Sequence, residues 1–546
     1  MDKRTLLAVV LSLAVLLGYQ YFFQKPVTRI QGETVMNAGE TTGKIENMPQ
    51  QIINNQSTYP VPVIDRQKSL TKKEGDTDTG KNIIVEGPMY SAIFNSRGAG
   101  LKSFKLKAFR NDMSKNSPLV ELVNAGESTD YPLTITFPES SIDIPADVIF
   151  ESDTDYLDFT DATGAKDLVF SWSYPGEVKV DKIYTFYPDK YAFDLETRFT
   201  NLSDDTIREN ALLSWTRHVD PSEKVNRYSH EGPISYVKDK VVSEKVKKLD
   251  AQKFSGPDVS WGGFETKYFI AAMIPEQPSL TNFIASRDSR NMVSTSLQGP
   301  KNIIPPGQSG SFRYVLYVGP KEYSRLQTQN VGLENSIDFG SWVKWLAIPL
   351  LKALKWIDKY VHNYGIAIIL LTILVKLIFW PLGNMSYKSM RGMQKLQPQM
   401  KQLQEKHKGD KAKLQQATMA LYKANKVNPM SGCLPMLLQL PVFFGLYRAL
   451  LYSIELRHAP FMFWIQDLSA KDPYYITPIV MGATMFLQQK MSPQPGGNEM
   501  QAKMMLWMPV IFTFLFLNFP SGLVIYWLFN NVLSIGQQYY INTKNP

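Results

Sequence analysis

Apolar residues form long uninterrupted runs near both ends of the chain and short alternating runs in between. After Lys3 and Arg4, an apolar run extends from Leu6 to Phe23, close to the ~20 residues that cross the hydrocarbon core. Because basic residues stay on the cytoplasmic side, residues 1–23 are predicted to be a transmembrane anchor with a cytoplasmic amino terminus. The alternative is a cleaved signal peptide, but no small-x-small cleavage site follows the run.

A polar tether and a β domain are predicted next. Residues 24–80 are rich in Asn, Gln, Thr, Gly and Ser and lack an apolar period, which is typical of a flexible segment. Residues 81–330 contain short apolar or alternating runs separated by Pro, Gly, Asn and Asp, the pattern of strands and turns. Between Tyr191 and Phe199 apolar and charged side chains alternate, which predicts one buried face. We expect a β-sandwich of two large sheets.

Residues 341–360 have the pattern of an amphipathic helix. Four lysines (Lys344, Lys352, Lys355 and Lys359) share one stripe, and three tryptophans lie beside it. This arrangement predicts a helix that lies on the membrane surface and is kinked at Pro349. The alternative is an ordinary surface helix of the β domain.

Five further membrane segments are predicted in the carboxy-terminal part, at 363–382, 432–453, 474–489, 504–518 and 523–541. The last two come from one apolar stretch that Phe519-Pro-Ser-Gly interrupts. With the anchor there are six spans, so both termini are expected in the cytoplasm. Residues 384–429 contain ten Lys or Arg but only Glu405 and Asp410. We therefore expect this segment to be a cytoplasmic helical hairpin, bent at Pro398, because cytoplasmic loops are rich in basic residues.

Composition adds mainly exclusions. The mean hydropathy of −0.19 averages a polar first part with an apolar second part. Much of the net charge of +9 is assigned to membrane topology, because many Lys and Arg lie between apolar segments. The single cysteine, Cys433, excludes an intrachain disulfide. Motifs for nucleotide, zinc or serine-nucleophile chemistry are absent from the sequence, so we expect no enzymatic activity, cofactor or metal.

Lys376 is the most informative residue, because it lies within an apolar segment, where a cation costs several kcal/mol unless it reaches water or a partner. None of the five carboxy-terminal segments has an Asp or Glu in its core, which favours a hydrated cavity around Lys376. Thr372 shares its helix face. Four residues of other segments are candidates for further polar lining, and the alternative for each is a helix-to-helix hydrogen bond: Gln439, Asn518, Asn530 and Asn531. The alternative is that Lys376 extends to the cytoplasmic interface near Trp380.

The chain resembles the YidC family of membrane insertases, in its Gram-negative form, over nearly its whole length. The most specific blocks are Asn428-Pro-Met-Ser-Gly-Cys-Leu-Pro-Met-Leu-Leu-Gln-Leu-Pro-Val-Phe, Glu455-Leu-Arg-His-Ala-Pro-Phe, Trp464-Ile-Gln-Asp-Leu-Ser, Asp472-Pro-Tyr-Tyr and Phe519-Pro-Ser-Gly-Leu-Val-Ile-Tyr-Trp. This resemblance implies an α+β membrane protein with six transmembrane helices, of which five form the insertase core, and a large periplasmic β-supersandwich. It also implies a hydrophilic intramembrane groove with a positive charge, usually Arg and here Lys376. Substrate-contacting positions of the family correspond to Thr372, Gln439, Phe443 and Trp527, the last often Tyr.

The function implied is a membrane protein insertase and chaperone of the bacterial inner membrane. Its expected partners are nascent membrane proteins, the Sec translocon, the ribosome through the basic cytoplasmic loops, and membrane lipids, with no specific nucleic-acid sequence. Two rivals remain. A secondary transporter commonly needs intramembrane carboxylates or broken helices at a midplane site, and only the Pro520-Ser-Gly break fits. A membrane-anchored carbohydrate-binding protein would be supported by paired carboxylates in a cleft of the β domain.

Overall fold

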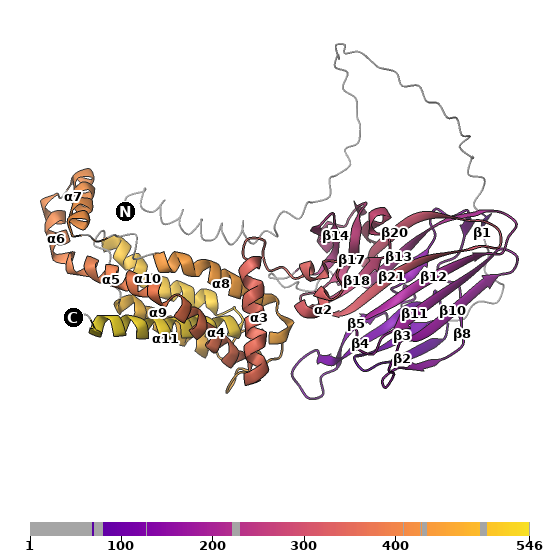
Figure 1. The fold of residues 1–546 in the computed structure, drawn as a ribbon, viewed down its shortest axis with the longest axis horizontal. Helices are drawn as coiled ribbons and strands as arrows, with labels where there is room; N and C mark the ends of the chain where they lie inside the picture. Colours follow the sequence, from indigo (N-terminus) through magenta and orange to yellow (C-terminus); the bar gives the residue numbers. More distant parts are fainter. Residues whose placement is uncertain are drawn as a thin grey trace, which may run out of the picture. The chain divides into compact units, whose positions relative to one another are not determined.

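The computed structural model describes residues 68–69, 80–126, 128–220, 230–407, 409–425, 427, 434–491 and 499–544. The predicted anchor at 1–23 and most of the predicted tether at 24–80 lie outside these residues. The chain divides into two units, Met1–Ser336 and Ile337–Pro546. Figure 1 shows the first as strands in purple and magenta and the second as helices in orange and yellow.

The first unit is built around a nine-stranded antiparallel sheet. Short alternating runs form these strands because every second side chain is buried, as in β12, where Phe193, Leu195 and Phe199 are buried. In spatial order the strands are β15 (Lys240–Ser243), β14 (Gly232–Val237), β17 (Val259–Glu265), β18 (Phe269–Pro275), β21 (Ser309–Pro320), β12 (Ala192–Asn201), β11 (Val178–Phe186), β10 (Lys166–Tyr174) and β8 (Glu151–Ser152).

Two five-stranded sheets form the facing layer. The first has the order β16 (Lys253–Ser255), β19 (Asn282–Arg287), β20 (Met292–Ile304), β13 (Ile207–His218) and β6 (Thr134–Thr136). The second has the order β5 (Leu119–Asn124), β4 (Gly100–Arg110), β3 (Tyr90–Asn95), β2 (Asn82–Glu86) and β9 (Tyr156–Asp158). A small parallel pair joins β1 (Lys68–Ser69) to β7 (Ile142–Asp143).

Both five-stranded sheets pack against the same face of the large sheet. The ring of Phe193 lies 6.2 Å from that of Phe104 on β4, and the ring of Phe199 lies 5.4 Å from that of Phe137, directly after β6. Phe193 and Phe199 are an even number of positions apart on β12, so they point to one side. The unit is therefore a sandwich, but the second of the two expected large sheets is divided in two.

The β unit extends slightly beyond the predicted end at residue 330. After β21, a short helix α2 (Tyr323–Gln327) and a 3₁₀ turn η3 (Leu333–Ser336) follow. Leu326 and Leu333 are fully buried, so this segment adds apolar surface to the domain core and the boundary moves to Ser336.

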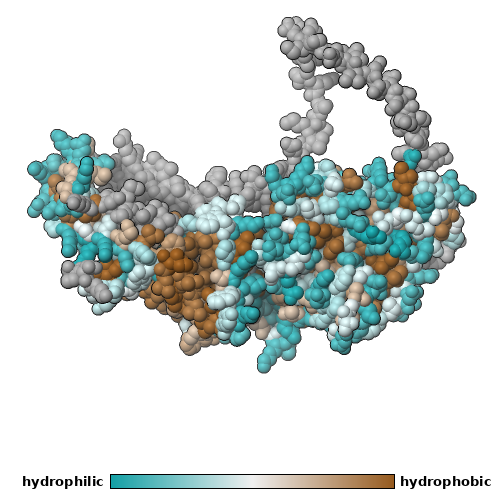
Figure 2. All heavy atoms as spheres, in the orientation of Figure 1, coloured by the Kyte–Doolittle hydropathy of each residue, from teal (hydrophilic) through white to brown (hydrophobic). Residues whose placement is uncertain are grey.

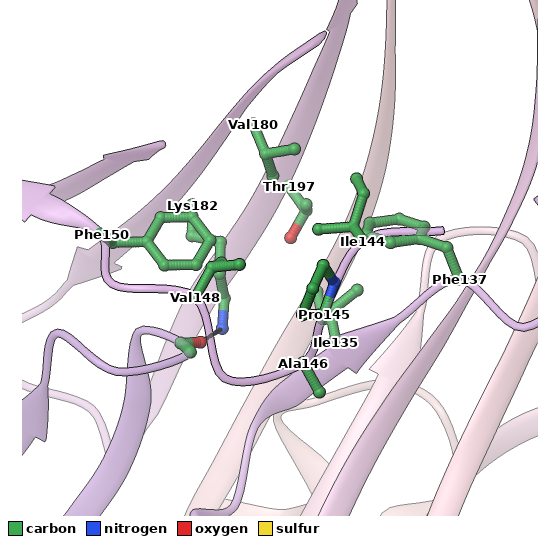
Figure 3. A pocket seen from close by; sticks show the side chains of 11 residues that line it. Ile135, Phe137, Ile144, Pro145, Ala146, Val148, Phe150, Val180, Lys182 and Thr197 are labelled. Atoms are coloured by element: carbon green, nitrogen blue, oxygen red, sulfur yellow. Dashed lines mark hydrogen bonds between the residues drawn. The ribbon is translucent and has the colours of Figure 1, made fainter. Parts of the chain in front are cut away.

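One position on the buried face of β11 is occupied by a lysine. The alternation that buries Val180 and Tyr184 also buries Lys182, which is 1% exposed. Its amine donates to the carbonyls of Gly98, Ala99 and Leu133 at 3.0, 2.9 and 2.8 Å. Figure 3 shows this side chain beside a small cavity of about 20 Å³. Burial lowers the pKa of Lys182 to about 7.

The second unit is helical. Its helices are α3 (Lys344–Val361), α4 (Tyr364–Ile378), α5 (Trp380–Lys395), α6 (Gln397–Lys406), α7 (Lys411–Ala424), α8 (Leu434–Tyr452), α9 (Ile476–Met491), α10 (Glu499–Phe516) and α11 (Ser521–Lys544), with a 3₁₀ turn η5 (Ile454–Leu456) after α8. Helix α11 packs against α4 and α9, and α3 packs against α4 and α8. The 3.6-residue apolar period explains how α3 docks, because Ala347, Leu350 and Leu354 are buried while Trp345 and Trp356 are exposed.

The predicted span 363–382 is wrong as a single helix. Helix α4 ends at Ile378, and α5 begins at Trp380 with Pro381 in its first turn. Proline lacks an amide hydrogen and its ring clashes with the carbonyl four residues earlier, so inside a helix it causes a kink or a break, whereas the first turn of a helix accommodates it, as α5 does here. No single described helix is both long and apolar enough to cross a bilayer alone, whereas α4 and α5 meet these criteria together, bent by 65°.

The predicted hairpin over 384–429 also has different bounds. Its first arm starts at Trp380 and divides at Leu396 into α5 and α6, directly before Gln397 and Pro398. Helices α6 and α7 then pack against each other. The break between α5 and α6 lies directly before Pro398, the proline at which the bend was expected. Residues 408, 426 and 428–429 of the predicted hairpin lie outside the described ones.

The helical unit exposes a broad apolar surface. Large apolar side chains are exposed along α4, α9 and α10, among them Leu377, Ile378, Ile479, Val480, Trp507, Ile511 and Phe514. Figure 2 shows this surface as a continuous brown patch over the helices. Patches of this kind mark contact with lipid or with another protein.

Candidate functional site

Lys376 points into the helical unit. The side chain of Asn363 caps α4 by accepting a hydrogen bond from the amide of Ile366, and Lys376 lies in the last turn of this helix. Its amine donates to the hydroxyl of Ser534 on α11 at 2.6 Å. No Asp or Glu forms an ion pair with Lys376 among the residues that the structure describes. The cation is thus held by a neutral hydroxyl, and it does not extend directly to the helix exterior.

Helix α11 presents a stripe of polar side chains to its neighbours. At 100° per residue these positions fall within about 120° of arc. All but the first are almost fully buried, although the helix is otherwise largely apolar. The members of the stripe are Asn530, Asn531, Ser534, Gln537 and Gln538.

Each side chain of the stripe finds a partner in another element or in its own helix. Gln537 donates to the Asn384 side chain on α5 at 3.0 Å, and Gln538 donates to the carbonyl of Met491 at the end of α9 at 2.8 Å. The hydroxyl of Ser534, besides accepting from Lys376, donates to the carbonyl of Asn530 at 2.7 Å. Buried polar groups of this kind are stable only when paired, so the stripe fixes the register of α11 against α4, α5 and α9.

Two further sequence candidates lie near this stripe. Gln439 on α8 donates to the Asn530 side chain at 2.7 Å, so the structure joins it to the same polar face. Thr372 is buried on α4, and its hydroxyl donates to the carbonyl of Ile368 in its own helix at 2.7 Å. Thr372 shares a helix face with Lys376, but no described hydrogen bond joins them.

The aromatic candidates form a separate level of the site. The rings of Phe443 and Trp527 meet edge to face with centroids 4.6 Å apart. Trp527 also contacts Phe516 at 5.2 Å and Phe512 at 6.2 Å. Aromatic pairs in this geometry contribute about 0.5–1.5 kcal/mol of stabilisation beyond that of their buried area. The polar stripe is therefore bounded at one end by a stable aromatic cluster.

These levels follow one another along a single face of α11. Trp527, Asn530, Ser534 and Gln537 are spaced by three, four and three residues, so they lie above one another over about 15 Å of helix. The face changes from aromatic at Trp527 to amide at Asn530, then to the Lys376 ammonium at Ser534, and to amide again at Gln537.

Sequence reasoning missed part of this arrangement. Ser534, Gln537, Gln538 and Asn384 were not singled out, although they contact Lys376 or extend its polar face. The signal was present, because polar residues recur at three- and four-residue spacing in an otherwise apolar helix. No cluster of three or more His, Cys, Asp or Glu suited to a metal occurs within the described ranges.

Comparisons with known proteins agree over the whole chain. The family model described as "60Kd inner membrane protein" matches residues 356–546, and "YidC periplasmic domain" matches residues 82–353. A protein named "Membrane protein insertase YidC" from Syntrophus aciditrophicus (strain SB) is 58% identical over 550 residues, covering 100% of both chains. A second of that name, from Geobacter metallireducens, is 42% identical over 542 residues and covers 99% of this chain and 98% of its own.

A solved structure described as an active YidC insertase with its first transmembrane domain resolved is also similar. It shares 20% identity and covers 85% of this chain and 93% of its own, with a TM-score of 0.37.

Proposed function

The chain belongs to the YidC family of membrane protein insertases, and from this premise we propose that the Lys376 face of α11 is the path by which short hydrophilic segments of a substrate cross the membrane. The protein is an integral inner-membrane insertase with a periplasmic β domain. Its family acts by insertion and is not a class of catalytic enzymes, and we propose that this member likewise carries out no covalent chemistry. The apolar segments of the substrate leave sideways into lipid.

The observation that carries this proposal is the incomplete coordination of Lys376. An ammonium has three N–H donors, and Ser534 is the hydrogen-bond partner that the described residues supply. The remaining donors are available for water or for an acidic part of the substrate. Because Coulomb attraction is stronger where the effective dielectric is low, one cation suffices to draw a carboxylate inward.

The energy for insertion does not require a nucleotide. Burying apolar substrate surface in lipid yields about 25 cal/mol per Å², and the membrane potential contributes about 2.3 kcal/mol per charge and 100 mV. In this mechanism the polar stripe lowers the barrier for the hydrophilic segment. The rings of Phe443 and Trp527 then exclude water at one end of the path.

The topology belongs to the same proposal. Six spans put both termini in the cytoplasm, and α5, α6 and α7 with their excess of basic residues lie on that side. This basic surface suits ribosomal RNA, the Sec translocon is the partner for larger substrates, and α3 lies at the lipid surface. Helix α9 has 16 residues, roughly 24 Å, so the bilayer beside the path is expected to be thinner than its usual ~30 Å.

Substitution of Lys376 tests the mechanism directly. Lys376→Arg keeps the charge and is expected to retain insertion, whereas Lys376→Ala is expected to impair substrates with acidic translocated tails more than neutral ones. The measurement is protease protection of the translocated tail in cells depleted of the natural protein. Lys388→Ala is the matched control, because it removes a lysine from an exposed position on α5. Equal tolerance of all three variants for both tails would refute charge attraction.

A deletion separates the two units. We expect that removing residues 81–320 leaves insertion largely intact, because the proposed path lies entirely in the helical unit. Loss of insertion at normal abundance of the truncated chain would refute this division.

A further inference from the structure

The β domain contains a polar cleft that insertion does not use. It lies where β13, β19 and β20 meet the loops before β6 and after β7, with a volume of about 450 Å³, within the roughly 300–1,000 Å³ of small-molecule sites. Hydroxyl side chains from neighbouring strands line it: Thr134, Ser214, Thr216, Ser286 and Ser294. Because strands are ~4.8 Å apart, these hydroxyls form a regular grid.

The charged groups in the cleft nearly cancel one another. Arg290 contacts Asp130 and Asp288, each at 2.9 Å, and Arg97 contacts Asp147 at 2.8 Å. Two guanidinium groups thus face three carboxylates. An anionic ligand would meet the carboxylates and a cationic ligand would meet the guanidinium groups, so the cleft favours neither.

Arg290 retains the capacity to bind a neutral ligand. Its Nε and Nη2 contact the two carboxylates, and Nη1 has no partner among the described residues. The Arg290 side chain is 69% exposed, so a ligand has access to it. A fixed guanidinium between two carboxylates offers donors and acceptors side by side.

We propose that this cleft binds a neutral oligosaccharide. Each sugar hydroxyl both donates and accepts. It therefore matches the acceptor lone pairs that the strand hydroxyls keep beside their internal hydrogen bonds, and it matches the donors and acceptors of Arg290 with Asp130 and Asp288. Asp130 and Asp288 are the paired carboxylates expected of a carbohydrate site. Both are ion-paired with the same guanidinium, so in this proposal they serve as acceptors for sugar hydroxyls.

Titration calorimetry on the full-length protein in detergent tests this proposal. The probes are maltotriose, triacetylchitotriose and, as a non-sugar of similar size, tetraalanine. We expect saturable binding of one trisaccharide with a Kd of about 1 mM or tighter and no binding of tetraalanine. The two sugars distinguish an unsubstituted glucan from an N-acetylated glycan.

Variants locate the site. Arg290→Ala and Ser294→Val are each expected to weaken binding about tenfold or more by leaving sugar hydroxyls unpaired. Arg313→Ala is the matched control, because Arg313 also lies between two carboxylates, Glu196 and Glu276, outside the cleft. Absence of binding for both sugars, preferential binding of tetraalanine, or equal affinity in Arg290→Ala and Arg313→Ala would each overturn the proposal. Unchanged melting of each variant shows that a loss arises at the cleft.

Discussion

Each of the two units has a lysine directed inward, Lys182 fully buried and Lys376 partly buried, and the two amines are held in different ways. In the β domain, Lys182 donates to three backbone carbonyls, which matches its three N–H donors. In the helical unit, Lys376 donates to one side-chain hydroxyl. The three acceptors of Lys182 are backbone carbonyls, whereas the single acceptor of Lys376 is a side-chain hydroxyl that itself donates to the Asn530 carbonyl. An amine whose donors are all taken by backbone carbonyls ties parts of the fold together, and one with donors to spare remains available to bind.

The largest expected effect is loss of stability on removal of the first amine. Lys182→Met removes the amine donor from the carbonyls of Gly98 and Leu133 and leaves that of Ala99 with the Tyr184 hydroxyl alone. This is expected to lower the unfolding free energy of the β domain by about 3 kcal/mol. Faster hydrogen exchange of the β11 amides in the full chain would report it. Lys179→Met is the control, because Lys179 lies on the same strand but is exposed. Equal hydrogen-exchange rates of the β11 amides in the two variants would contradict the view that Lys182 stabilises the domain by binding the three carbonyls.

The pH dependence of Lys182 sharpens this prediction. Burial lowers its pKa from 10.5 to about 7 in the folded protein, so between these values the unfolded chain binds the extra proton. The unfolding free energy of the natural protein therefore rises with pH from about 7 to 10.5, relative to Lys182→Met, which does not titrate. Denaturant melts at pH 7 and pH 9 measure the difference, and a constant or falling difference would contradict it.

Glu209 should show the opposite slope, with a smaller effect. Both carboxylate oxygens are buried without a hydrogen-bond partner among the described residues, and burial raises the pKa of Glu209 from 4.5 to about 8. The folded protein binds the extra proton between these values, so stability falls as pH rises through this window. Glu209→Gln should stabilise the domain by on the order of 2 kcal/mol at pH 8. At pH 4.5 this gain should vanish, and melts at both values test the slope.

Lys376→Met should give the reverse outcome to Lys182→Met. The helical unit loses one hydrogen bond and the cost of a buried charge, so its melting temperature is expected to change little. Insertion of a substrate with an acidic tail should fall about tenfold, equivalent to about 1.4 kcal/mol. Detergent melts and protease protection measure the two effects. A large loss of stability without an insertion defect would make the two lysines equivalent and remove the contrast between the units.

The smallest effect is expected for Ser534→Ala. This change removes the acceptor of Lys376 but keeps the charge, so insertion should fall only two- to threefold, about 0.5 kcal/mol. Thr418→Ala on α7 is the control, because the Thr418 hydroxyl bonds within its own helix. A loss as large as that of Lys376→Met would mean that the orientation of the amine matters as much as its charge.

The sequence by itself determined the elements whose signal is local. Alternation along β12 predicted which side chains are buried, and the apolar period and prolines predicted most of the helices and the break before Pro398. Pro381 carries the same signal, but the span predicted at 363–382 passed through it, whereas α4 and α5 meet there at a bend of 65°. Lys376 was found because a cation in an apolar segment is costly wherever the helix lies.

Tertiary structure alone decided the partners of these side chains. A lysine at position 182 of an alternating strand gives no sign in the sequence that it will be buried. Its acceptors come from the loops at Gly98 and Leu133, which are distant in sequence. Ser534 and Gln537 are ordinary residues until α11 packs against α4 and α5. Local periodicity fixes which face of an element is apolar, but long-range packing fixes which polar groups meet, because hydrogen-bond partners depend on the register of elements far apart in the chain.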